Sequence, residues 1–316
     1  MRVAIAGVWH VHAPDYTKSA MALGEVIGVY DENPEWAKKF AEERNIPWFK
    51  TFEELLASDA EGVIVCSASN VHADMMVKIA ESGKDIFTEK VLALTTADCL
   101  RVKEAVEKAG VRFVVSMPQR RTRCPRTIKA LVDKGEIGKV NYIRFRNCHS
   151  GSVNHWLPAH FYDKEQCGGG AMIDLGAHGM YLIEWFLGVP EQFKSVFTHA
   201  CRDEQDAVLN PSALEDNAVT VMSYADGTIA VNETGFVSIG APMTLEVGGD
   251  RGTLRYANEE VTLCGVTTEN KTVSVPLLDA MDMPIVSFLK GEKPADCDIN
   301  AAIALTAMME GAYANA

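Results

Sequence analysis

The chain has 316 residues, of which 47% are hydrophobic and 23% charged, a composition typical of soluble globular proteins. Its formal net charge of −13 argues against a nucleic acid partner, because phosphate binding needs a basic surface. No apolar run reaches the roughly 18–20 residues that span a bilayer, and the start shows no signal-peptide pattern, so no membrane partner is expected. The eight cysteines are scattered without a Cys-x-x-Cys pair, which indicates reduced thiols in a cytoplasmic protein.

The first part of the chain alternates short apolar runs with amphipathic stretches. Strands are predicted at residues 3–6, 25–30, 62–66, 85–88 and 112–116. Helices are predicted near residues 15–23 and at 34–44, 52–57, 71–82 and 96–109. Alternation with unbroken apolar strands favours a parallel sheet covered on both faces. Residues 1–118 are therefore expected to form an α/β, doubly wound, Rossmann-type domain that binds a dinucleotide.

The pattern changes after Pro118. Helices are predicted at residues 124–134 and 168–187, near 280–289 and at 299–314. Strands are predicted at 140–146, 195–200, 217–224, 228–233, 243–247, 253–256, 261–263 and 272–275, with a hairpin turn at 225–227. Residues 119–316 are therefore expected to form an α+β domain with a largely antiparallel open sheet.

The first strand leads into Gly7-Val8-Trp9-His10-Val11-His12, where the glycine fingerprint of a dinucleotide site belongs. Gly7 is present, but Trp9 and His12 occupy the positions of the second and third glycines. A bulky residue at either position forces the loop to open. The alternative is a nucleotide-free domain in which Trp9 simply packs.

Asp31 ends the second strand, 24 residues after Gly7. An acidic residue there accepts hydrogen bonds from ribose hydroxyls and repels a 2′-phosphate, which favours NAD over NADP. The alternative is an ordinary helix N-cap. The third strand feeds residues 67–72 at its carboxyl end, where open α/β sheets bind ligands. Asn70 in this segment has the same alternative, as the N-cap of the next helix.

Two later segments carry groups that can move a proton on or off a sugar-like hydroxyl. Glu89 and Lys90 follow the fourth strand, and Asp174 and His178 follow three glycines at 168–170. On a helix, Asp174 and His178 share one face, about one turn apart. The glycines would let backbone approach a ligand closely at the start of that helix.

Together these pieces resemble the Gfo/Idh/MocA oxidoreductase family, which includes glucose–fructose oxidoreductase and inositol dehydrogenase. The resemblance covers nearly the whole chain and rests on the first strand and turn and on residues 70–72, 83–90, 168–178, 185–188 and 225–228. It implies that the first domain binds NAD(H) and that Lys90, Asp174 and His178 are catalytic. It also implies that the second sheet shapes the substrate pocket and an oligomer interface, in a homodimer or homotetramer. The family's Glu-Lys-Pro reads Glu89-Lys90-Val91 here.

The cofactor contacts expected from the motifs and the resemblance are Gly7, Trp9, His10, Val11, His12, Asp31, Ser67, Ala68, Asn70, His72, Glu89 and Lys90. For catalysis, His178 suits a general acid/base and the Lys90 ammonium suits stabilisation of an alkoxide. Asp174 would bind a substrate hydroxyl or orient Lys90 or His178. The alternatives are a structural histidine and a solvated lysine.

A loop before the glycines carries His149, His155, Trp156 and His160. It could cover the active site and present donors and a stacking surface to a sugar ring. The alternatives are a zinc site and histidines that act as polar filler; no metal is expected.

Arg120 and Arg121 lie at the domain junction, where the family often places substrate or cofactor contacts. They belong to a basic cluster with Arg123 and Arg126, whose alternative reading is a solvated or salt-bridged loop.

The first functional hypothesis is an NAD-dependent dehydrogenase that acts on a sugar, cyclitol or sugar derivative. The second keeps the same cleft but recycles NAD, so that an epimerase, lyase or glycosidase-type reaction proceeds without net redox change. The third is a binding or regulatory protein on a Rossmann scaffold that no longer binds the cofactor.

Overall fold

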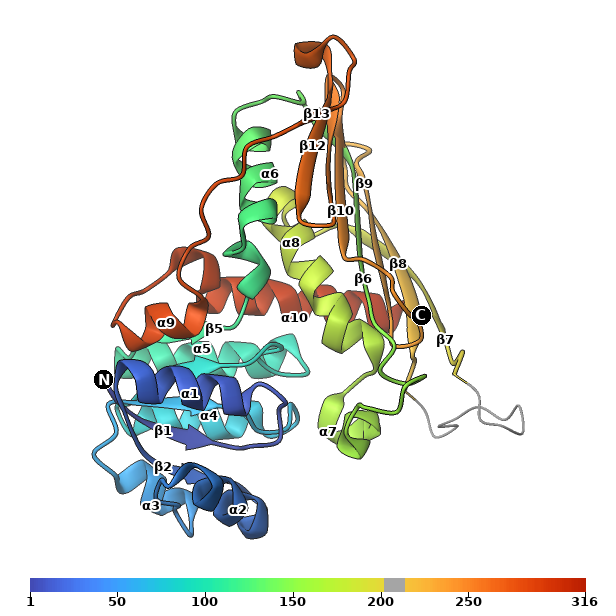
Figure 1. Ribbon diagram of the computed structural model, residues 1–316. Helices are drawn as coiled ribbons and strands as arrows, with labels where there is room; N and C mark the ends of the chain where they lie inside the picture. The colour runs from blue at the N-terminus through green and yellow to red at the C-terminus, as the bar shows by residue number, and fades with distance from the viewer. Residues whose placement is uncertain (202–213) are drawn as a thin grey trace. The chain divides into compact units, whose positions relative to one another are not determined.

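The computed structural model describes residues 1–201 and 214–316 and contains two compact units (Figure 1). The first unit comprises Met1–Pro118 and Asp282–Thr306, and the second comprises Gln119–Met281 and Ala307–Ala316. Residues 282–306, which the sequence analysis placed in the second domain, lie in the first unit. In the described part of the chain, none of the helices has both the length and the apolar character needed to cross a membrane.

The first unit is built on a five-stranded parallel sheet in the order β2-β1-β3-β4-β5. Its strands are β1 (Arg2–Ala6), β2 (Glu25–Tyr30), β3 (Gly62–Val65), β4 (Asp85–Thr88) and β5 (Phe113–Val115). The apolar side chains of β1, β3 and β4 are almost completely buried, as a parallel sheet covered on both faces requires. The doubly wound sheet predicted from the sequence is confirmed.

The strands are connected by α1 (Ala13–Leu23), α2 (Pro34–Arg44), α3 (Phe52–Ala57), α4 (His72–Glu81) and α5 (Thr96–Ala109). The unit also contains α9 (Pro284–Leu289) and a 3-10 turn at Ala295–Cys297. The side chains of Asn33, Thr51 and Thr95 cap the first turns of α2, α3 and α5. Helix α9 begins at Pro284 rather than near residue 280, because proline favours the first helical turn.

The second unit is built on an eight-stranded sheet in the order β13-β12-β11-β10-β6-β9-β8-β7. All its strand pairs are antiparallel except β6 with β9. The strands are β6 (Val140–Cys148), β7 (Gln192–Thr198), β8 (Asn217–Ser223), β9 (Ile229–Gly235), β10 (Thr244–Gly249), β11 (Gly252–Ala257), β12 (Glu260–Gly265) and β13 (Val273–Ser274). The predicted, largely antiparallel sheet is therefore confirmed, although β7 begins three residues earlier than expected.

Helices α6 (Arg123–Asp133) and α8 (Ala177–Leu187) lie along one face of this sheet (Figure 1). No helix of the described residues covers the other face, where Val196, Val219, Val221 and Ile229 are 67%, 37%, 40% and 43% exposed. The unit also contains α7 (Lys164–Cys167) and 3-10 turns at Ala159–Tyr162 and Val266–Thr268, and a further 3-10 turn, Pro118–Arg120, begins with the last residue of the first unit. Helix α10 (Ile299–Ala314) contributes residues to both units.

The regular α-helix predicted for residues 168–187 is wrong in its first part. Residues 168–170 are not helical, and Met172–Gly176 form a π-helical segment that leads into α8. Asp174 lies in this π-helical segment and His178 lies in α8, so α-helical periodicity does not describe the interval between them. Segments of this kind are frequent at functional sites.

Candidate active site

Gly7 forms the turn after β1. Its φ of +89° lies in the left-handed region that favours glycine, and any side-chain carbon added there would overlap the backbone of Ser67. The Gly7 N–H donates to the carbonyl of Tyr30 at 2.7 Å. This turn therefore passes close to the ends of both β2 and β3. Of the three fingerprint positions, only the first must be glycine for this close approach.

Asp31 fastens the same turn to β2. Its carboxylate accepts hydrogen bonds from the backbone N–H of Val8 at 2.7 Å and of Asn33 at 2.8 Å, and the residue is buried. The alternative that Asp31 caps a helix is wrong, because the Asn33 side chain caps α2. Asn70 likewise makes no cap for α4, whose N-cap position is Val71 without a side-chain hydrogen bond, and it is exposed.

The other residues expected to contact the cofactor divide into buried and exposed groups. Trp9, Ser67 and Ala68 are each no more than 8% exposed, whereas Val11 is 45% exposed. His72 is buried, with Nδ1 3.0 Å from the carbonyl of Val91 and Nε2 2.9 Å from that of Ser67. Burial lowers the pKa of His72 although both backbone hydrogen bonds raise it. His72 thus joins the end of β3 to the segment directly after Lys90.

His10, His12 and Glu89 form a compact cluster at the carboxyl edge of the parallel sheet. Oε1 of Glu89 lies 2.8 Å from Nδ1 of His12 and 3.8 Å from Nδ1 of His10. The hydroxyl of Tyr16 donates to the same oxygen and lies 2.8 Å from the hydroxyl of Ser116. All three residues were expected to contact the cofactor, but their grouping into one cluster was not predicted, because Glu89 lies 77 residues beyond His12.

Glu89 is a buried carboxyl group whose neighbours favour its charged form. Burial raises its pKa, but the charges of His10 and His12, the hydrogen bond from His12 and the charge of Lys90 together hold the pKa well below its usual range. The pKa values of the Tyr16 hydroxyl and the Cys66 thiol are raised well above their usual values, first by burial and then by the charge of Glu89. Lys90 is also buried, and its backbone N–H donates to Oε2 of Glu89 at 3.1 Å.

In the second unit, a buried glutamate holds the start of the segment that carries Asp174 and His178. The carboxylate of Glu215 accepts hydrogen bonds from the backbone N–H of Gly170 at 3.1 Å and of Met172 at 2.9 Å. The Tyr313 hydroxyl donates to Glu215 at 2.7 Å and accepts from the N–H of Ile173 at 3.1 Å. Sequence reasoning missed both residues, since neither belongs to a motif.

The glycines before this segment serve close packing. A side-chain carbon at Gly169 would overlap the Tyr313 hydroxyl, and one at Gly170 would overlap the Glu215 carbonyl. The prediction that they open the backbone to a ligand is wrong for the N–H groups of residues 170, 172 and 173, because the protein's own carboxylate and phenol occupy them.

His178 has a fixed hydrogen-bond partner within α8. Its Nδ1 lies 2.8 Å from the hydroxyl of Tyr181, which accepts the backbone N–H of Gln119 at 3.0 Å. The hydroxyl oxygen can also accept from Nδ1–H, and its hydrogen can be donated to Nδ1, so the hydrogen bond fixes the position of the ring in either neutral tautomer.

The arginines expected to contact a substrate are both buried. Arg120 pairs with Glu184 and donates to the carbonyl of Tyr181. Arg123 and Arg126 donate to the carbonyls of Leu278 and Asp279. The salt-bridged alternative thus describes Arg120, which fastens the start of the second unit to α8.

The histidine loop is aromatic rather than metal-binding. His149 stacks on Phe236 at 4.9 Å between ring centres and lies 4.6 Å from Trp156, itself 54% exposed. Burial lowers the pKa of His149, and the charge of Asp174 opposes that shift. His155 is exposed, and the ring of His160 lies against Phe161. Among the described residues, the one group of three possible metal ligands is His10, His12 and Glu89, so the three loop histidines do not form the alternative zinc site.

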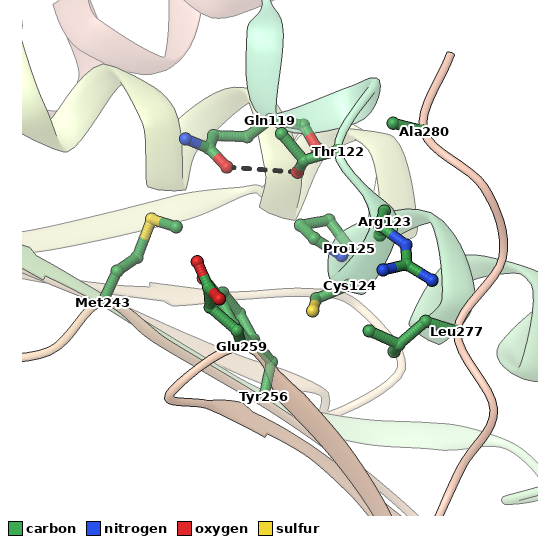
Figure 2. Close-up of a pocket in the computed structure, with 10 residues that line it drawn as sticks. All are labelled: Gln119, Thr122, Arg123, Cys124, Pro125, Met243, Tyr256, Glu259, Leu277 and Ala280. Carbon is green, nitrogen blue, oxygen red and sulfur yellow. Dashed lines mark hydrogen bonds between the residues drawn. The ribbon is translucent and has the colours of Figure 1, made fainter.

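Each unit also contains a cavity. The cavity of the second unit, about 390 Å³, lies at the start of α6 between Gln119 and Thr122 on one side and Tyr256 and Glu259 on the other (Figure 2). Its lining, within the described residues, includes neither Asp174 nor His178. The cavity of the first unit, about 480 Å³, lies beside Tyr30 at the end of β2 and is bordered by α4.

Comparison with known proteins assigns both parts of the chain to one family. Residues 1–117 match the model described as "Oxidoreductase family, NAD-binding Rossmann fold", and residues 126–255 match the "GFO/IDH/MocA C-terminal domain". Myo-inositol 2-dehydrogenase of Thermotoga maritima is 27% identical over 70% of this chain and 64% of its own length. The NAD⁺-dependent scyllo-inositol 2-dehydrogenase of Bacillus subtilis is 28% identical over 80% of this chain and 73% of its own length.

The matched region thus spans less than two thirds of the Thermotoga enzyme. Among solved structures, levoglucosan dehydrogenase in complex with NADH and levoglucosan aligns with a TM-score of 0.79 at 16% identity. That alignment covers 100% of this chain and 98% of the other, and it shows the same fold.

Proposed function

Because the chain belongs to the GFO/IDH/MocA oxidoreductase family, we propose that it is an NAD-dependent dehydrogenase. It transfers hydride between nicotinamide and a secondary alcohol of a sugar, cyclitol or sugar derivative. The observation that carries the proposal is the buried Lys90, which lies two residues after the end of β4 at the carboxyl edge of the parallel sheet. Ligands bind at this edge in open α/β sheets. The inositol dehydrogenases among the relatives support the substrate class.

The first unit suits a dinucleotide. Gly7 makes the tight turn after β1, and Asp31 at the end of β2 is placed to accept ribose hydroxyls and to repel a 2′-phosphate. The cavity beside Tyr30 is of a size to receive the adenosine part. NAD is therefore the proposed cofactor in preference to NADP, and when bound it supplies the hydride acceptor.

The chain's own residues would handle the charge and the proton. The Lys90 ammonium holds the substrate oxygen and stabilises negative charge that develops on it. His178, when neutral with its proton on Nδ1, would accept the hydroxyl proton on Nε2 during oxidation, and the resulting imidazolium would return it during reduction. Asp174 binds a neighbouring hydroxyl or orients these two groups. The neighbouring rings of His149 and Trp156 would offer an aromatic surface to a sugar ring.

The chain is proposed to act in the cytoplasm as a homodimer or homotetramer. All eight cysteines are free thiols, as expected in a reducing compartment. A second copy of the chain would cover the valine-rich open face of the eight-stranded sheet. Val196 and Val219 are direct cross-strand neighbours there, so two copies could bury the same apolar strip.

The test is an absorbance assay at 340 nm with NAD⁺ and a panel of inositols, aldoses and sugar acids, repeated with NADP⁺. We expect NADH to accumulate with at least one polyol and NADP⁺ to react more slowly. Substrate conversion without NADH would instead favour the redox-neutral hypothesis. Absence of NAD binding in calorimetry would contradict the proposal and favour a regulatory protein.

A further inference from the structure

The cluster of His10, His12 and Glu89 is not needed for any step of the proposed dehydrogenase. It lies where the second and third glycines of the fingerprint are replaced, and all its members belong to the first unit. Each residue offers one ligand atom, and these atoms lie within 4.8 Å of one another. Two imidazoles and one carboxylate are a frequent ligand set for divalent transition metals.

We propose that His10, His12 and Glu89 bind one divalent transition-metal ion, with Zn²⁺ as the best fit. The site goes beyond the proposed function, because it can be occupied and measured without NAD or substrate. It also accounts for the departure from the glycine fingerprint, since a glycine at position 12 would provide no ligand.

The spacing of the ligand atoms fits such an ion. Zinc binds nitrogen and oxygen at roughly 2.0–2.2 Å, so neighbouring ligand atoms of a tetrahedral site lie about 3.3 Å apart. The two distances from Oε1 of Glu89, 2.8 Å to His12 and 3.8 Å to His10, bracket that value. His10 and Glu89 are buried, whereas the His12 side chain is 44% exposed and has room to adjust. The exposed side also gives an entry path and a place for a water ligand.

The charges favour a cation at this position. A buried carboxylate needs a positive partner, and Glu89 is 1% exposed. The His10 and His12 rings lie 4.8 Å apart between centres, so two imidazolium ions there would repel each other. A divalent ion would neutralise Glu89 while both histidines stay neutral. The other titratable groups that interact electrostatically with Glu89 are Lys90, Tyr16, Cys66 and His72.

Tyr16 provides the outer shell that metal sites need. Its hydroxyl donates to Glu89 and lies within hydrogen-bond distance of Ser116, which fixes the direction of the carboxylate. Partners of this kind typically contribute roughly 10–100-fold in metal affinity. Tyr16 is therefore a positioning residue, and its loss should weaken the site without abolishing it.

The experiment is a titration of the chelator-treated, full-length protein with Zn²⁺ by calorimetry and with Co²⁺ by visible absorption, both without nucleotide. We expect one equivalent to bind, with visible cobalt bands typical of a low-coordinate site. His12→Gln and Glu89→Gln should each lower the affinity by more than about 100-fold, because a direct ligand matters more than an outer-shell partner. Tyr16→Phe should lower it by roughly 10–100-fold.

His155→Gln is the matched control, because it removes an exposed histidine outside the cluster; its affinity should equal that of the wild type. Circular dichroism checks that each variant folds. If Glu89→Gln fails to fold, His12→Gln provides the test, because the partly exposed His12 side chain is more easily replaced. The proposal is overturned if the wild-type protein binds neither ion, or if His12→Gln binds both ions as tightly as the wild type does. If the wild-type protein nevertheless binds NAD, the proposed dehydrogenase function is unaffected.

Discussion

Tyr181 illustrates how one hydroxyl sets the chemistry of its neighbour. It accepts an N–H from Gln119 and lies 2.8 Å from Nδ1 of His178, so it fixes the orientation of the imidazole. The sequence shows only a tyrosine three residues after a histidine, and the residue that holds the tyrosine hydroxyl lies 62 residues earlier.

We expect Tyr181→Phe to lower kcat by up to about tenfold with little change in KM, since it removes one hydrogen bond of about 1 kcal/mol. The acid limb of the pH–rate profile should move to lower pH, because the imidazolium loses the acceptor of its Nδ1–H. A profile identical to that of the wild type would show that the bond has no part in the reaction. A thermal melt distinguishes this effect from loss of packing.

Lys90→Met and His178→Ala should each lower turnover by roughly 10²–10⁴-fold if the two residues do charge and proton work. Steady-state assays of NADH formation measure the change. Lys18→Met serves as control, because Lys18 is an exposed lysine of α1 and should retain wild-type rates. Near-normal turnover in both variants would remove Lys90 and His178 from the mechanism.

At the scale of elements, the start of the Asp174 segment depends on a carboxylate. Glu215→Ala would leave the buried N–H groups of Gly170 and Met172 without their acceptor, at a cost of about 1–3 kcal/mol each. We therefore expect unfolding at lower denaturant concentration and reduced activity, because Asp174 and His178 follow directly. Exposed Glu191→Ala is the control. An unchanged midpoint would contradict this role for Glu215.

His72, which joins the end of β3 to the segment after Lys90, should make the stability of the protein depend on pH. Burial lowers the pKa of His72 from its ordinary 6.5, so the unfolded chain binds a proton that the folded chain refuses. The stability from neutral His72 is complete above pH 6.5 and is lost as the pH falls towards the lowered pKa. Urea unfolding at pH 7.5, 6.5 and 5.5 should show this decline, and His72→Gln should flatten it. Equal slopes in both proteins would refute the assignment.

Most elements could be predicted because their signals are local. Apolar runs placed the helices and strands of residues 1–118 to within two residues. The π-helical segment at Met172–Gly176 was missed, because residues outside it, including Glu215 and Tyr313, hold its backbone. His10, His12 and Glu89 were each expected at the cofactor site, but their close grouping was not predicted, because sheet topology rather than spacing brings them together.

At the scale of the whole molecule, the open face of the second sheet is the surface to test. The double variant Val196→Lys/Val219→Glu places opposite charges on direct cross-strand neighbours, which leaves the single sheet compatible with folding. Light scattering should find the wild type as a dimer or tetramer and this variant as a monomer. Val266→Glu, which changes an exposed valine in a 3-10 turn, should keep the wild-type mass. A monomeric wild type would contradict the proposed assembly.

Helix α10 has a practical consequence for handling the protein. Near its end, the phenol of Tyr313 reaches Glu215 and Ile173, and the carbonyl of Asn315 receives the N–H of Ser195 at 2.9 Å. An affinity tag or reporter fused directly after residue 316 would therefore lie close to the residues that hold the segment with Asp174 and could displace them. Any preparation that is inert in such a format should be remade with a long flexible spacer before its catalytic competence is judged.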